Sequence, residues 1–319
     1  MQESIWEGEW DMTMTGMLPH FTSLQEALSA LFGNGIQAVR HDRVSGGDIN
    51  EAYSLLLNNG MRIFMKANTK QNLSFFQSEA AGLSAIAKTG TAGTPRMLGM
   101  GTDEGRGGFS FLLMELVQAG KKVSGYWEVF ARQLADMHRS DTGAFVSGGL
   151  YGFLQDNYIG ANRQVNTSSG SWIDFFRECR LEPQVRSAAR YFEKAELKKI
   201  SMLLEHTDSI LTEPEFPSLL HGDLWAGNVM TGNDGRVWLI DPAAYVGHAE
   251  ADLAMTELFG GFPQDFYRAY QEALPLQPGY DRRRDFYNLY HLLNHLNLFG
   301  VSYLSPVRNV IRKYADTLS

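Results

Sequence analysis

Apolar positions in the first third of the chain follow a helical period and then a strand-like one. Residues 21–31 repeat apolar side chains at helical spacing, which predicts a short helix. Two β-prone runs, Glu51 to Leu57 and Met61 to Ala67, flank Asn58-Asn59-Gly60. Because Asn-Gly accepts the positive φ angles of a tight turn, these runs predict an antiparallel hairpin. A helix over about 74–88 and a strand over 109–117 complete the elements predicted here.

The rest of the chain has a helical pattern, apart from one short β region. That region runs from Leu219 to Asp241, with a turn at Asn233-Asp234-Gly235. The predicted helices cover 126–139, 172–180, 188–211, 251–259 and 281–299. The sequence therefore predicts an α+β protein of two lobes: a small antiparallel sheet with one helix, and a larger, mostly helical lobe. The predicted boundaries are an arm over 1–20, an N-lobe over 21–117, a linker over 118–125 and a C-lobe over 126–319.

Composition and charge narrow the classes of partner. The 319 residues are 44% hydrophobic and 20% charged, which is ordinary for a globular protein. The net charge of −8 argues against a general binder of nucleic acid or of anionic membranes, although a few local cations can still hold a phosphate. The first basic residue is Arg40, and apolar runs fall far short of the roughly 20 residues of a membrane span. A single cysteine, Cys179, fits a reducing compartment, so we expect a cytoplasmic protein.

Three polar residues of the β region have the spacing of a phosphoryl-transfer site. Asn228 follows Asp223 by five positions, and Asp241 follows Asn228 by thirteen. Phosphoryl transfer needs a carboxylate near the attacking hydroxyl and oxygen ligands for Mg²⁺, and a kinase catalytic loop has this order of residues. Each residue alone is commonplace in turns. Their coincidence with a hairpin predicts Asp223 as the catalytic base and Asn228 and Asp241 as metal ligands.

Upstream residues supply candidates for phosphate binding. Lys66 ends the second strand of the first hairpin, and Glu79 lies thirteen residues later in the next predicted helix. A strand lysine positioned by a helix glutamate is the arrangement of kinases, although both residues alone are ordinary surface residues. The glycine turn at Gly46-Gly47-Asp48 is a weaker signal, and no Walker motif occurs.

Two histidines resemble half of a zinc motif. His291 and His295 are four residues apart on a predicted helix, but the glutamate of His-Glu-x-x-His is missing. This pattern favours polar packing or the wall of a pocket over a zinc site.

With these residues in place, the chain resembles the fructosamine kinase (ketosamine 3-kinase) family, a branch of the aminoglycoside-phosphotransferase and choline-kinase group with a protein-kinase-like fold. The resemblance is carried by His221-Gly222-Asp223-Leu224-Trp225-Ala226-Gly227-Asn228 and covers nearly all of the chain after about residue 35. The further matching segments are 46–50, 156–160, 172–176, 241–243, 250–255 and 291–300. Gly-Asp followed by Asn marks the whole superfamily, whereas Trp225 and the last two segments point to this branch.

The resemblance implies Mg²⁺- and ATP-dependent phosphorylation of the third-carbon hydroxyl of a ketosamine, either a small molecule or a glycated lysine of a protein. The product is unstable and frees the amine, so the reaction amounts to deglycation and repair. The implied nucleotide contacts are Lys66 set by Glu79, a cover formed by Gly46, Gly47, Asp48 and Asn50, and an adenine-binding hinge at Met114, Glu115 and Leu116. The implied substrate contacts are Trp225, Asp156, Asn157 and His291.

Two departures from related patterns bear on regulation. Ser45 stands where eukaryotic members of the family often carry a cysteine in the phosphate loop, and Asp241 is followed by Pro-Ala rather than by Phe-Gly. We therefore expect neither the redox-sensitive feature nor a phosphorylation-switched activation loop. A kinase of an aminoglycoside or a choline-like amine is the alternative on the same fold, and a non-catalytic pseudokinase is the alternative from another class. The sequence leaves the choice of ketosamine and the oligomeric state open.

Overall fold

The computed structural model describes residues 18–44, 50–105 and 107–318, and they fall into two compact units. The first unit comprises the described residues of 18–44, 51–73 and 97–115, and the second comprises residue 50, 74–96 and 116–318. The predicted lobe boundaries at 117 and 125 stay a prediction, and the helix over 74–88 groups with the second unit.

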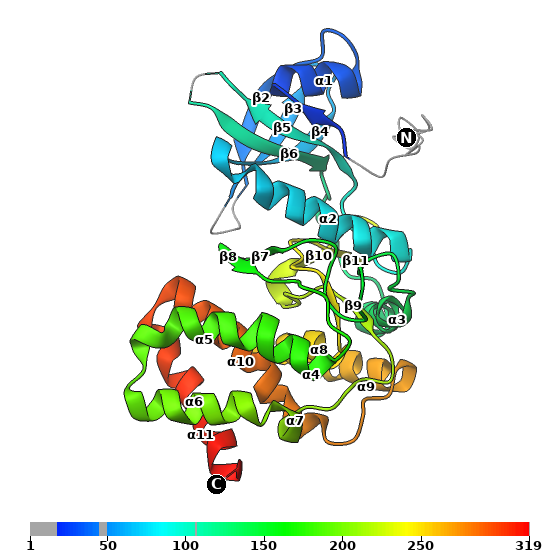
Figure 1. Cartoon of the computed structure of the whole chain (residues 1–319). Helices are drawn as coiled ribbons and strands as arrows, with labels where there is room; N and C mark the ends of the chain where they lie inside the picture. The colour runs from blue at the N-terminus through cyan, green and yellow to red at the C-terminus, as the bar shows by residue number, and fades with distance from the viewer. Residues whose placement is uncertain (1–17, 45–49, 106, 319) are drawn as a thin grey trace. The chain divides into compact units, whose positions relative to one another are not determined.

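The first unit is a six-stranded sheet with one helix (Figure 1). Its strand order is β1-β5-β6-β4-β3-β2, with β1 parallel to β5 and every other pair antiparallel. Side chains of α1 pack against those of the central strands, in a core that includes Leu28, Leu55, Ile63 and Phe111. The elements are β1 (His20–Phe21), α1 (Leu24–Phe32), β2 (Ala38–Arg43), β3 (Glu51–Leu57), β4 (Arg62–Thr69), β5 (Met97–Asp103) and β6 (Phe109–Glu115).

The predicted hairpin is confirmed as β3 and β4. The chain reverses at Asn58–Gly60, where Gly60 has φ 86° and the Leu57 amide donates to the Met61 carbonyl at 2.8 Å. The prediction missed β5, which contains Gly99 and Gly101. A Cβ atom on Gly101 would lie 2.0 Å from the Phe21 carbonyl oxygen, so the close approach of β1 requires glycine where the strand pattern is interrupted.

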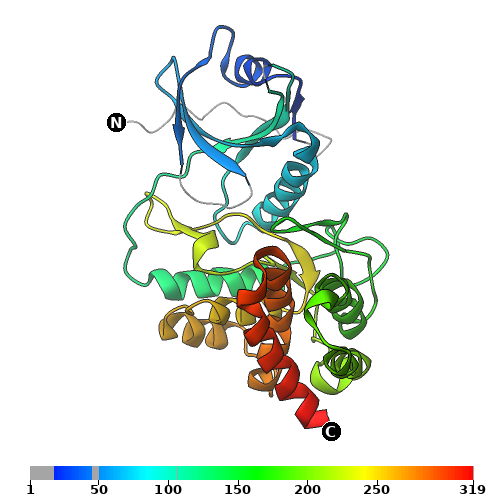
Figure 2. The same cartoon turned by 90° about the vertical axis from the view of Figure 1, so that its left-hand side faces the viewer.

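The second unit is mostly helical. The long helix α10 contacts α5, α8 and α11, and α3 packs along α9 (Figure 2). Its helices are α2 (Leu73–Thr89), α3 (Tyr126–Arg139), α4 (Trp172–Phe175), α5 (Glu182–Ala188), α6 (Lys194–Glu205), α7 (Thr207–Ile210), α8 (Glu250–Leu258), α9 (Gln264–Ala273), α10 (Tyr280–Phe299) and α11 (Leu304–Leu318). Its strands are β7 (Asn157–Ile159), β8 (Asn162–Gln164), β9 (Ser218–Leu220), β10 (Val229–Thr231), β11 (Val237–Leu239) and β12 (Tyr245–Gly247).

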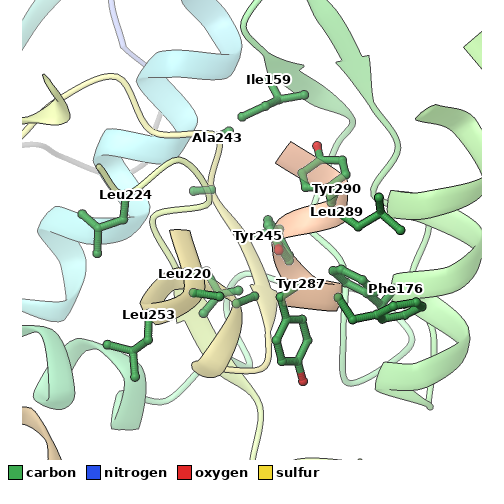
Figure 3. Packing of buried hydrophobic residues seen from close by; sticks show 14 of the residues in the cluster. Ile159, Phe176, Leu220, Leu224, Ala243, Tyr245, Leu253, Tyr287, Leu289 and Tyr290 are labelled. Atoms are coloured by element: carbon green, nitrogen blue, oxygen red, sulfur yellow. The ribbon is translucent and has the colours of Figure 1, made fainter. Parts of the chain in front are cut away.

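The core of this unit joins the short strands to the helices. Tyr245 on β12 and Leu220 on β9 lie beside Tyr287 and Tyr290 of α10 and Phe176 (Figure 3). The predicted helix over 188–211 is wrong in its extent: the chain is extended at Phe192, and α6 begins anew with a capping box between Glu193 and Glu196. No described helix is both long and apolar enough to cross a membrane.

Candidate active site

The loop after β9 is held by a buried carboxylate. The backbone N–H groups of His221 and Gly222 donate to the two oxygens of Asp252, at 2.7 and 2.8 Å. Asp252 lies on α8 and is 1% exposed. His138 of α3 contacts the same carboxylate at 3.3 Å, and its other ring nitrogen lies 2.7 Å from the Tyr270 hydroxyl of α9. Three helices thus fix the start of the loop that carries Asp223.

The charge of Asp252 is stabilised although it is buried. Burial alone would raise the pKa of this carboxyl, but the hydrogen bond with His138 and those from the backbone bring the pKa below its usual value. An ionised carboxylate accepts hydrogen bonds that are stronger than those between neutral groups. Sequence reasoning included Asp252 only as part of a matching segment and gave it no role.

The loop of Asp223 touches the loop that follows Asp241. Gly222 has φ 80°, and a Cβ atom there would lie 2.1 Å from the Ala243 carbonyl oxygen. The Ala243 amide donates to the His221 carbonyl at 2.9 Å. Glycine is therefore required at position 222 both by its backbone conformation and by the neighbouring chain.

The three residues predicted to do the chemistry converge. The amide nitrogen of Asn228 donates to the Asp223 carboxylate at 3.0 Å and to the Asp223 carbonyl at 2.8 Å. The hairpin of β10 and β11 brings position 241 to the same place, because the Ile240 amide donates to the Asn228 carbonyl at 3.1 Å. A short loop thus brings Asn228 against Asp223, five residues earlier, and the hairpin of β10 and β11 brings Asp241 near Asn228, thirteen residues earlier.

The carboxyl of Asp223 is tuned toward neutral pH. Burial raises its pKa to about 7, the hydrogen bond from Asn228 opposes this rise, and the negative charges of Asp241 and Asp252 add to it. A general base works best when its pKa lies near the working pH.

The donor set fits a hard divalent cation that also binds phosphate. The Asn228 nitrogen is used by Asp223, so the amide oxygen is the atom of this side chain suited to a metal, together with the carboxylate of Asp241. Among the described residues, no group of three or more His, Cys, Asp or Glu side chains gathers to hold a metal. Mg²⁺ in phosphoryl transfer takes few protein ligands and completes its shell with phosphate oxygens and water, so one Asp and one Asn suffice.

Asp241 has an unusual backbone. Among the described residues it is the non-glycine residue with positive φ, 54°. Such a conformation costs free energy and persists only where the surroundings impose it, often at functional sites. The next residue, Pro242, packs against Gly82 of α2, where a Cβ atom would lie 3.0 Å from the proline ring. Helix α2, which also carries Glu79, therefore lies directly against the loop after Asp241.

A buried polar network supports the other side of that loop. Asn157 donates to the Ala244 carbonyl at 2.8 Å, and Gln164 donates to the Ala243 carbonyl at 3.0 Å. The Tyr290 hydroxyl of α10 in turn donates to the Gln164 oxygen at 2.6 Å. Asn157 is 2% exposed, so its position favours support of the loop, and its predicted contact with substrate stays a prediction.

Asp156, the neighbouring predicted substrate residue, is also engaged within the chain. One carboxylate oxygen accepts from the Arg163 guanidinium at 2.6 Å, and the other accepts from the backbone N–H of Asn166 at 2.8 Å. These contacts hold the hairpin of β7 and β8 together. A contact of Asp156 with substrate also stays a prediction.

Arg180 is a buried cation at the base of this network. It lies in a π-helical segment, Phe176–Leu181, and is fully buried. Its guanidinium donates to the Val165 carbonyl at 2.6 Å and to the Asn166 side chain at 2.7 Å, and it lies 3.8 Å from the centre of the Tyr245 ring. The cation thus links the residues that follow β8 to Tyr245 of β12, and the sequence did not predict this contact.

The remaining predicted substrate residues differ in exposure. Trp225, two residues after Asp223, is 38% exposed and lies edge-on to Phe259. His291 is buried in α10, its Nδ1 atom has no hydrogen-bond partner within the described part of the chain, and burial lowers its pKa to about 3. His291 is therefore a neutral ring at neutral pH, and its predicted contact with substrate stays a prediction.

The predicted nucleotide contacts lie mainly in the first unit. Lys66 lies on β4, opposite Ala52 of β3 and Leu112 of β6. Met114 and Glu115 end β6, and Leu116 follows directly. Lys66 and Glu79 belong to different units, so their pairing stays a prediction. Gly46, Gly47 and Asp48 lie outside the described residues, and Asn50 immediately precedes β3.

Sequence comparison with known proteins identifies relatives along nearly the whole chain. The family model described as fructosamine kinase matches residues 20–317. A Synechocystis protein assigned as a ketoamine kinase is 36% identical over 292 residues, covering 91% of this chain and 95% of its own length. The chloroplastic protein-ribulosamine 3-kinase of Arabidopsis thaliana is 37% identical over 291 residues, covering 90% and 86%.

Solved structures agree with the predicted fold. The crystal structure of a Haemophilus somnus protein assigned as a fructosamine-3-kinase matches with a TM-score of 0.80 at 30% identity, over 91% of this chain and 96% of that one. An aminoglycoside phosphotransferase shares the fold at 16% identity, with a TM-score of 0.58, over 92% of this chain and 99% of that one. The predicted α+β, kinase-like fold is confirmed, and the chain belongs to the fructosamine kinase family.

Proposed function

We propose that the protein transfers the terminal phosphoryl group of ATP to the third-carbon hydroxyl of a ketosamine, with Mg²⁺ as the metal. The observation that carries this proposal is the cluster of Asp223, Asn228 and Asp241, in which a carboxylate of raised pKa lies 3.0 Å from the amide of one candidate metal ligand. Relatives named protein-ribulosamine 3-kinase and ketoamine kinase, at 36–38% identity, support a glycated amine as the acceptor.

Within this proposal, Asp223 orients the substrate hydroxyl and accepts its proton as the new O–P bond forms and the bond from the terminal phosphorus to the bridging oxygen breaks, with ADP as the leaving group. Asn228 and Asp241 would hold Mg²⁺, which when bound neutralises the charge of the phosphates. Lys66, positioned by Glu79, contacts the phosphates, and the segment from Gly46 to Asn50 covers them. The backbone of Met114 to Leu116 binds the adenine, and Trp225 lines the sugar site.

The main test is the substitution Asp223→Asn, assayed by steady-state phosphorylation of ribulosamine and fructosamine substrates. Removal of a general base is expected to lower kcat by about 10²–10⁴-fold. Asp316→Asn makes the same carboxylate-to-amide change on the exposed face of α11 and should leave kcat unchanged. A loss of only a few-fold in Asp223→Asn would contradict the assigned role.

A substrate panel separates the ketosamine assignment from the other kinases on this fold. The panel adds an aminoglycoside and choline to the two ketosamines. Turnover of choline or the aminoglycoside, with none of the ketosamines, would refute the proposed acceptor while leaving the phosphoryl-transfer site intact. Binding of ATP without turnover on any acceptor would instead support the pseudokinase alternative.

A further inference from the structure

A row of aromatic side chains extends from the catalytic loop across the end of α10. Neighbouring rings in this row have centroids 4.8–6.3 Å apart, within the range of favourable aromatic contacts. They come from the loop of Asp223, the end of α8, the last turns of α10 and the turn before α11. We call these residues the aromatic row: Trp225, Phe259, His295, Phe299 and Tyr303.

The two ends of the aromatic row are open to solvent. Trp225 is 38% exposed and Phe299 is 51% exposed, and the adjacent Val301 is 71% exposed. Scattered exposed apolar residues are ordinary, but a connected set of rings beginning two residues from a catalytic carboxylate is a different feature. Because Trp225 belongs to the loop that carries Asp223, one end of the row lies on the same loop as the candidate base.

The ring at the centre of the aromatic row is uncharged. Burial lowers the pKa of His295, and its Nδ1 atom lies 2.8 Å from the His291 carbonyl oxygen. A carbonyl only accepts hydrogen bonds, so Nδ1 carries the proton and Nε2 keeps its lone pair. The row therefore presents π faces and an acceptor nitrogen, without a positive charge that would repel a cation.

We propose that the aromatic row binds the amine-bearing remainder of the ketosamine, with its ammonium group and attached hydrocarbon chain over the rings. This inference rests on the proposed function. In a ketosamine the nitrogen is bonded to the first carbon, two carbons from the hydroxyl that Asp223 faces. The nitrogen therefore lies close to the hydroxyl that Asp223 faces, and Trp225 follows Asp223 by two residues on the same loop. The occupant that fits is a glycated lysine side chain, which has one cation and four methylene groups.

Kinetics on a matched series of ribulosamines tests this subsite. The series carries the same sugar on methylamine, on the ε-amine of acetyl-lysine and on benzylamine. Wild-type protein should prefer the lysine and benzylamine compounds over the methylamine compound through a lower KM. In Phe299→Ala and Tyr303→Ala this preference, as the ratio of kcat/KM values, should fall about five- to twentyfold, the range expected for loss of a ring contact with the attached hydrocarbon, because every compound of the series carries the same ammonium group.

Two further variants keep the test sharp. Phe299→Leu retains apolar surface but removes the ring, so it should lose part of the preference for lysine and most of that for benzylamine. Val129→Ala removes an apolar side chain of similar exposure (41%) on α3, outside the aromatic row, and should keep the wild-type ratio.

The possible outcomes are distinguishable. If the wild-type protein phosphorylates no ribulosamine or fructosamine, the proposed function fails. If it does, but the ratio is unchanged in Phe299→Ala and Tyr303→Ala, or all substrates lose activity equally, only the subsite is refuted. A change from dimer to monomer in Phe299→Ala by light scattering, with an unchanged ratio, would assign the row to contact between copies and overturn the inference.

Discussion

The contact between the two active-site loops predicts a sharp difference between two glycine-to-alanine substitutions. Gly222→Ala places a Cβ atom 2.1 Å from the Ala243 carbonyl oxygen, at a residue with φ 80°. Gly90 ends α2 with φ 66° and has open space around its Cβ position, so Gly90→Ala is the matched control. Both changes impose a left-handed conformation on alanine, but only the first also pushes apart two loops.

The expected magnitudes follow from these contacts. The left-handed conformation costs alanine about 1–2 kcal/mol, and this is the whole expected effect at Gly90. At Gly222 an ordinary contact of 3.4 Å requires a loop to move by about 1 Å, which also breaks the hydrogen bond from Ala243 to His221, for about 1 kcal/mol more. We expect Gly222→Ala to lower the free energy of unfolding by about 2–3 kcal/mol.

The effect on catalysis should be larger than the effect on stability. Gly222 adjoins Asp223, and Ala243 lies two residues after Asp241, so the movement separates the proposed base from the proposed metal ligand. A misplacement of about 1 Å can cost about 10²-fold in rate, so kcat should fall by that factor. Urea denaturation and steady-state kinetics measure the two quantities. Equal losses of stability in Gly222→Ala and Gly90→Ala, with kcat within threefold of wild type, would refute the reasoning.

Three further substitutions test buried polar groups. Asp252→Asn replaces one of the two oxygens that accept from the backbone N–H groups of His221 and Gly222. We expect the free energy of unfolding, measured by urea denaturation, to fall by about 2–3 kcal/mol and kcat to fall as well. An unchanged kcat would show that the loop does not need this anchor. Burial lowers the pKa of His248 to about 4, against 6.5 in the unfolded chain. Between pH 6.5 and 4 the unfolded chain therefore binds a proton that the folded protein does not, so the free energy of unfolding should fall by about 3 kcal/mol as the pH is lowered over this range. His248→Gln should reduce this dependence of the unfolding free energy on pH, and an unaltered dependence would contradict the prediction. Arg180→Met removes donors to Val165 and Asn166 and should cost about 3 kcal/mol, whereas Arg163→Met, on an exposed pair, should cost less than about 1 kcal/mol; similar losses would refute the difference.

The sequence predicted correctly those elements whose conformation depends mainly on residues that are neighbours along the chain. The hairpin of β3 and β4 follows from an Asn-Gly turn between two apolar runs, and α3 has the predicted bounds of 126 and 139. Asp223 and Asn228 were identifiable because one short loop fixes their distance. In each case the residues that decide the conformation are neighbours in sequence.

Elements that depend on distant partners were missed or predicted only in part: the β region predicted from Leu219 overlaps β9, but its partner β12 was not predicted. β9 and β12 are three-residue strands that pair with each other and are buried, so they lack the alternation of a half-exposed strand. Helix α6 begins at a capping box with Glu193 as N-cap, a residue that is not among the favoured capping types. A helical period continues across this break, and the sequence therefore predicted one long helix.

The anchors of the active site were missed for a related reason, which also suggests how they can be found. Asp252 acts on backbone groups thirty residues earlier, and its partner His138 is 114 residues away, so no spacing along the chain reports their contact. What the sequence does contain is a conflict: Glu250 and Asp252 alternate with apolar residues up to Met255 in α8, and both are buried. Burying a carboxylate is costly unless donors satisfy it, so an acid among the apolar positions of a helix indicates that another segment must supply those donors. In this protein Asp252 accepts from the two backbone N–H groups before Asp223 and contacts His138, and the buried acid therefore points to the loop that carries the proposed base.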